Sequence, residues 1–113
     1  MISKKTLKLS VKSLKDFAKK QLPDETLIEL DARVHRFVAR CSRNPYLEQD
    51  LDRYLNMSLR IWRLTWDRLP PLQDRIREHC DLLDAIRQGQ PERARAVAQA
   101  HVRAFAEEMR AAL

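Results

Sequence analysis

Proline and glycine divide this sequence at four points, and these divisions limit the regular structure that it can form. The prolines stand at positions 23, 45, 70, 71 and 91, and Gly89 is the only glycine. Between them, apolar residues recur every three or four positions, the period of a helix buried on one side. No stretch alternates for long enough to suggest a strand. We predict an all-α fold, an antiparallel bundle of four to five helices over about 24–42, 45–69, 72–88 and 91–113, with a doubtful one over 7–22.

Residues at the divisions also predict how the helices begin and end. Asp24 and Asn44 are suitable N-caps, and Pro45 suits the first helical position. Gly89 suits a helix C-terminus. The helix over 45–69 has an apolar face that we expect to point into the bundle, made of Leu47, Leu51, Tyr54, Ile61, Trp62 and Leu69.

Charge separates the chain into two parts. The net charge is +6, and all seven lysines lie within residues 1–20 with a single acid, whereas residues 21–113 hold fifteen arginines and fifteen acids. We therefore predict a lysine-rich segment of doubtful origin over 1–22 and a helical domain over 23–113. Because the second part has no basic excess, we expect no sequence-specific DNA binding by this chain alone. With no membrane span, no signal peptide and only two isolated cysteines, we expect a cytoplasmic protein.

The stretch LIELDARVHRFVA, residues 27–39, places a carboxylate among apolar residues. On a helix, Asp31 lies within the apolar stripe, and His35 lies at its edge one turn later. A carboxylate on a core-facing stripe is costly unless a partner neutralises it. The spacing of four residues lets Asp31 and His35 bind one ion together.

The other two histidines also fall on predicted inward faces. His79 lies between Ile76 and Leu83, and His101 lies between Val97 and Phe105. Facing helices can bring such side chains together, and one carboxylate with three imidazoles suits a divalent metal ion. We therefore predict metal ligands at Asp31, His35, His79 and His101, with zinc as the first choice and nickel, manganese or iron as alternatives. Glu78 is expected to face outward.

Two small polar residues, Ser58 and Thr65, lie in the middle of the inward face of the third helix. They are candidates for hydrogen bonds to a bound effector. The alternative is that each hydroxyl bonds to a carbonyl of its own helix. We find no convincing general base, so we assign no catalytic residue.

Three segments together carry a family resemblance: LDARVHRFVARCSRNPYL, SLRIWRLTWDRLP and REHCDLLDAIRQGQPERARAVAQAHVRAF. They resemble the FCD domain, the C-terminal effector-binding domain of GntR-family bacterial transcription regulators. The matching positions are Asp31, His35, Asn44, Pro45, Glu78, His79, Gly89 and His101.

The resemblance implies a sensor and not an enzyme. In this family the aspartate and three histidines hold a divalent metal, and a small carboxylate effector completes its coordination, which makes Asp31, His35, His79 and His101 the implied ligands. The resemblance covers residues 21–113, without the family's winged helix-turn-helix. It implies the sensing domain of a transcription regulator, here without its DNA-binding half, that forms a homo-oligomer such as a dimer. The alternatives are a truncated relic without function and a small metalloenzyme.

Overall fold

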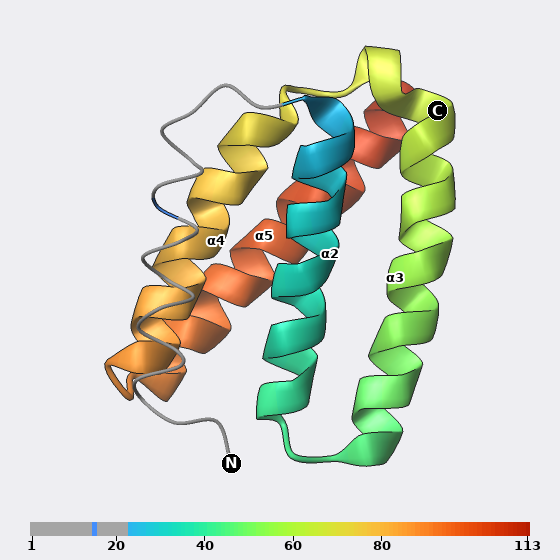
Figure 1. Cartoon of the computed structure of the whole chain (residues 1–113). Coiled ribbons are helices and arrows are strands. Elements are labelled where there is room, and N and C mark those ends of the chain that lie inside the picture. The colour runs from blue at the N-terminus through green and yellow to red at the C-terminus, as the bar shows by residue number, and fades with distance from the viewer. Residues whose placement is uncertain (1–14, 16–22) are drawn as a thin grey trace.

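The computed structural model describes residue 15 and residues 23–113, and over these residues the chain is helical. The helices are α2 (Asp24–Cys41), α3 (Pro45–Thr65), α4 (Leu72–Arg87) and α5 (Pro91–Ala112). A short 3-10 turn, η1 (Trp66–Arg68), follows α3. Consecutive helices run in opposite directions (Figure 1), so the predicted antiparallel all-α bundle is confirmed. The helix expected over 7–22 lies outside the described residues, apart from Lys15.

The turn between α2 and α3 is built as the sequence predicts. The side chain of Asn44 accepts hydrogen bonds from the backbone nitrogens of Tyr46 and Leu47, and Pro45 is the first residue of α3. Proline is favoured there because the first helical nitrogens lack an intrahelical acceptor. Before the turn, Arg43 takes a φ of 55°, a left-handed conformation that ends α2. Two backbone groups at the start of α3 are thus satisfied by one side chain.

Loss of this cap should destabilise the protein measurably. We expect Asn44→Ala to lower the free energy of unfolding by about 1 kcal/mol, because it removes the acceptor for both nitrogens. Urea denaturation followed by circular dichroism measures the change. Asn56→Ala is the matched control, since Asn56 is exposed in the middle of α3 and alanine favours a helix. An equal loss in both variants would contradict the capping role.

The other helix boundaries need two corrections. Pro23, and not Asp24, occupies the N-cap position of α2, without a side-chain cap. Helix α3 ends at Thr65, four residues before the predicted end, because the chain tightens into η1 ahead of the two prolines. Gly89 does end α4, with a φ of 66° that only glycine adopts freely.

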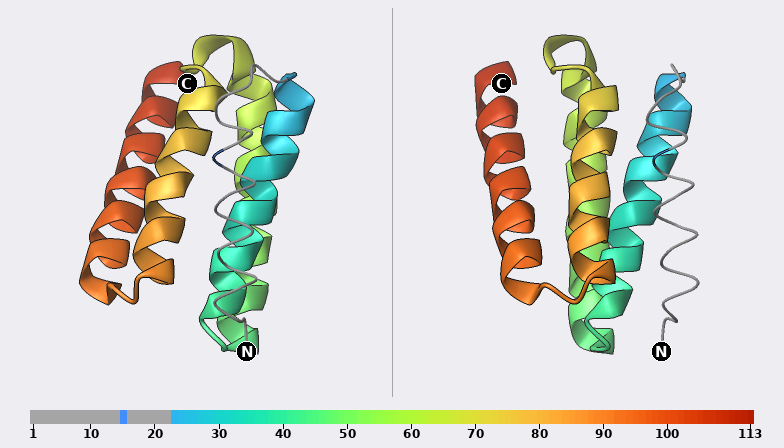
Figure 2. Two further views of the ribbon diagram at one scale, coloured as in Figure 1. Left: turned by 60° about the vertical axis from the view of Figure 1, so that its left-hand side comes forward. Right: turned by 90° about the vertical axis from the view of Figure 1, so that its left-hand side faces the viewer.

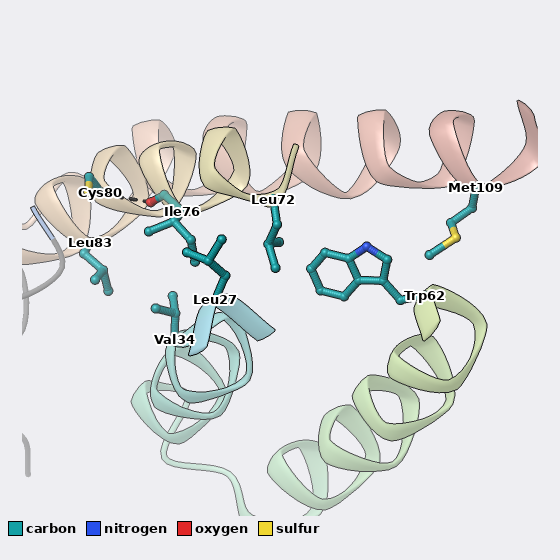
Figure 3. Packing of buried hydrophobic residues seen from close by; sticks show 8 residues of the cluster. All are labelled: Leu27, Val34, Trp62, Leu72, Ile76, Cys80, Leu83 and Met109. Carbon is teal, nitrogen blue, oxygen red and sulfur yellow. Dashed lines mark hydrogen bonds between the residues drawn. The ribbon is translucent and has the colours of Figure 1, made fainter. Parts of the chain in front are cut away.

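The hydrophobic core lies where α2, α4 and parts of α3 and α5 meet (Figures 2 and 3). Ile76 is fully buried and Leu83 almost so, and both belong to α4, which is the most buried helix. Helix α2 supplies Leu27 and Val34 to the same cluster. In Figure 3 the side chain of Trp62 on α3 lies between Leu72, at the start of α4, and Met109 on α5. Helix α4 is therefore the central element on which α2 and α5 are placed.

The predicted inward face of α3 is only partly buried. Trp62 is buried, but Leu47, Leu51, Tyr54 and Ile61 are between 41% and 63% exposed. The helical period predicted burial of the whole face, whereas in the structure the buried residues of α3 are Trp62 and Thr65, near its C-terminal end. Although several apolar side chains are exposed, none of the helices over the described residues is long and apolar enough to cross a membrane.

Candidate metal and ligand site

Three helices bring the four predicted ligands to one place. Asp31 and His35 come from α2, His79 from α4 and His101 from α5. Oδ1 of Asp31 lies 2.6 Å from Nε2 of His79 and 3.5 Å from Nε2 of His35. The ring centroids of the histidines are 4.7 to 5.6 Å apart. Residues separated by up to 70 positions thus converge on the carboxylate that the sequence placed in the core.

The donor atoms of the histidines are close enough together that they could hold a divalent metal ion. One nitrogen from each of His35, His79 and His101 lies within 4.8 Å of the others. Ligand atoms around tetrahedral zinc lie about 3.3 Å from one another, given bonds of about 2.0–2.1 Å. Small side-chain rotations would close that difference. The site could hold a metal through three neutral imidazoles and one carboxylate, a donor set that suits a borderline ion.

Asp31 remains charged although it is buried. Burial alone would raise its pKa, but hydrogen bonds from His35 and His79 and the charges of these rings hold the pKa well below its usual range. His79 is 1% exposed and Asp31 4%. In this arrangement the Nε2–H of His79 donates to Asp31, and a metal would replace that proton. The core thus holds an anionic carboxylate ready for a cation.

A second carboxylate, Glu78, reaches the site although the sequence suggested that it faces outward. Nδ1 of His101 donates to its Oε2 over 2.9 Å. Arg75, which is 7% exposed, donates to the same oxygen over 2.9 Å and also contacts Glu108 on α5. The pair of Arg75 and Glu78 has the i,i+3 spacing of a helix, but the contacts with His101 and Glu108 depend on how α5 crosses α4, which the helical period could not reveal.

Burial and charge set the protonation of this second group. Burial lowers the pKa of His101 although its hydrogen bond to Glu78 raises it, so the imidazole is neutral near pH 7. Partial burial would raise the pKa of Glu78, but His101 and Arg75 lower it below its usual value. Glu78 is therefore anionic, and His101 is in the neutral state that metal coordination requires.

All four predicted ligands line one cavity of about 740 Å³. Its walls are mainly apolar and come from α2, α3 and α5: Val34, Val38, Leu51, Leu55, Leu59, Trp62, Val102 and Phe105. Tyr54 also lines it and is 63% exposed, so the cavity opens to solvent along α3. Three arginines line it, and each has an acidic partner. Arg36 and Arg40 are half-exposed or more and lie close to Asp52 and Glu48, whereas Arg75 is buried against Glu78 and Glu108. The cavity is large enough for a small organic molecule.

The two effector candidates on α3 lie in different surroundings. Ser58 lines the cavity, and its hydroxyl donates to the carbonyl of Tyr54. Thr65 is fully buried outside the cavity lining, where its hydroxyl donates to the carbonyl of Ile61 and contacts the sulfur of Met109. Both hydroxyls therefore bond to their own helix. Only Ser58 is placed where it could also meet a cavity ligand.

Fold and site together define a helical ligand-binding domain with a polar cluster at one wall of an apolar cavity. A comparison with models of protein families shows which family of ligand-binding domains this is. The family model described as "FCD domain" matches residues 4–104, and the chain belongs to the FCD family. FCD domains are regulatory domains that bind small-molecule effectors, often with a metal, and are not a known enzyme fold.

The matched range bears on how the chain is divided. It begins at residue 4 and so includes most of the lysine-rich segment, while the separate origin expected for residues 1–22 stays a prediction. A search of curated proteins and a search of solved structures each found no significant match.

Proposed function

We propose that this chain is the metal-containing, organic-acid-sensing domain of a GntR-family transcription regulator. The observation that carries the proposal is the convergence of Asp31, His35, His79 and His101 beside one cavity. A bound ion, with zinc as the first choice, would be held by these four residues. It would supply a cationic centre for a ligand carboxylate. Because four protein ligands complete a tetrahedral zinc, the carboxylate would bind by raising the coordination number of the ion to five.

The cavity favours an organic acid with an apolar body. A carboxylate would bind at the metal, and its carbon skeleton would lie against Leu55, Leu59 and Val102. Burial of an apolar group is worth about 0.8 kcal/mol per methylene. The arginines Arg36 and Arg40 already have acidic partners, so the metal is the stronger anchor for the carboxylate. Ser58 would add a hydrogen bond only if its hydroxyl turned from Tyr54.

A homo-oligomer fits the surface of α3. Tyr46, Met57 and Leu64 are between 53% and 81% exposed. Large exposed apolar side chains on one helix favour association with another surface. The regulator would then transmit ligand binding from one subunit to the next. Sequence-specific DNA binding is not expected of this chain, because residues 21–113 carry no net charge.

Cobalt-loaded protein offers a direct test, because the visible spectrum of Co²⁺ responds to a change of ligand. We expect octanoate and acetate to change the spectrum, and octanoate to bind more than tenfold more tightly. Two buried methylenes alone give about 1.6 kcal/mol, which exceeds a factor of ten.

Octanol is the control, since it has a similar tail but no carboxylate. It should leave the cobalt spectrum unchanged at the same concentration. If neither acid alters the spectrum of protein that demonstrably holds cobalt, the proposal of an organic-acid sensor is wrong. If acetate and octanoate bind with equal affinity, the cavity does not bury the hydrocarbon chain of the ligand, and the proposed preference for an acid with an apolar body is wrong.

A further inference from the structure

Glu78 lies between the metal-ligand candidate His101 and a buried arginine. Its Oε2 accepts two hydrogen bonds of 2.9 Å, one from Nδ1 of His101 and one from Nη1 of Arg75. Arg75 also contacts Glu108 on α5, so its guanidinium group pairs with one carboxylate on each of the two helices. The side chain of Arg75 is only 8% exposed, which restricts its movement. Glu78 is therefore held in one orientation toward His101.

This orientation determines which nitrogen of His101 carries the proton. A carboxylate accepts but cannot donate, so the hydrogen on the ring must be on Nδ1. Neutral imidazole has a single N–H, which leaves Nε2 with a free electron pair. Metal-binding histidines commonly use one nitrogen for the ion and donate the other N–H to a carboxylate. The ring of His101 lies 4.7 Å from that of His79, within reach of the same ion.

The charges of the surrounding groups support the same interpretation. Arg75 places a buried positive charge one turn before His79, which by itself would oppose a nearby cation. Glu78 and Glu108 together supply two negative charges to this one positive charge. With Asp31, the surroundings carry a net charge of minus two, which matches a divalent ion.

We propose that Glu78, held by Arg75, is a positioning residue that fixes the Nδ1–H tautomer of His101 and so prepares Nε2 to bind the metal. The inference rests on the proposed metal site. It gives a role to a residue whose side chain the helical period predicted to face outward. Since Glu78 is 44% exposed in its side chain, its replacement should leave the fold intact.

The test combines metal affinity with a direct measurement of the tautomer. Competition between the protein and a chelator for zinc should show affinity reduced by about 10–100-fold in Glu78→Ala. Glu78→Gln should lose less, because its amide oxygen can still accept from Nδ1. Glu107→Ala and Glu107→Gln are matched controls, since Glu107 is exposed on the same helix as His101. Neither control should change zinc affinity.

Nitrogen NMR of the histidine rings in metal-stripped protein gives the second measurement. His101 should be the Nδ1–H tautomer in the wild type, and should shift toward Nε2–H in Glu78→Ala. Wild-type zinc affinity in Glu78→Ala, or an Nε2–H tautomer in the wild type, would overturn the inference. If the wild type binds no metal while His101 has the expected tautomer, the proposed function fails and the positioning by Glu78 stands.

Discussion

Zinc should raise the melting temperature of the purified chain by about 10 °C. A ligand that binds only the folded state at one hundred times its dissociation constant contributes about 2.7 kcal/mol. For a chain of this size, that corresponds to a shift of roughly 10 °C. Thermal unfolding followed by circular dichroism, with zinc and then with excess chelator, measures the difference.

Two variants show whether the predicted ligands cause this shift. His79→Ala removes a buried ligand, and His35→Ala removes one whose side chain is 36% exposed. For each variant, the melting temperature with zinc is compared with that of the same variant without zinc. Any loss of stability caused by the substitution itself then cancels. We expect most of the zinc response to disappear in both. Magnesium is the control ion, because it prefers oxygen ligands and should have little effect.

An unchanged melting temperature in wild-type protein shown to contain zinc would contradict the coupling of metal to folding. A full zinc response in both histidine variants would place the metal elsewhere. The second result would contradict the proposed ligands and with them the proposed function, whereas the first would contradict only the link between metal binding and stability.

The buried pair of Asp31 and His79 should prove unnecessary for stability in the metal-free protein. We expect Asp31→Ala to lower the free energy of unfolding by about 1–3 kcal/mol, because Nε2–H of the buried His79 then lacks an acceptor. The double variant Asp31→Ala/His79→Leu should regain most of this loss. Replacing both members of a buried polar pair with apolar groups is often neutral or stabilising.

Urea denaturation of the wild type, Asp31→Ala, His79→Leu and the double variant forms a complete double-mutant cycle. Recovery in the double variant would mean that the pair is kept for a purpose other than folding, which agrees with a binding site. If the double variant is as unstable as the sum of the single ones, the pair is a stabilising feature and supports no functional argument. All proteins in the cycle must first be stripped of metal.

Local signals in the sequence are enough to predict the four described helices and the convergence of Asp31 with the three histidines, but not the part of Glu78. Asn44 with Pro45, the pair Pro70 and Pro71, and Gly89 fix the turns, because their effects on the backbone are local. The period of 3.6 residues likewise predicts that His79 and His101 point inward, because apolar residues one turn before and after each of them define the buried face. These inferences need no knowledge of how one helix meets another.

The surroundings of Ser58, Thr65 and Glu78 depend on contacts between helices. Ser58 and Thr65 share a helix face, yet one lines the cavity and the other is sealed against Met109, because α3 meets α5 over only part of its length. Glu78 lies at the edge of the buried face of α4. It meets His101 only because α5 crosses α4 at this point. Helical period describes one helix at a time, so contacts between helices of this kind cannot be read from it.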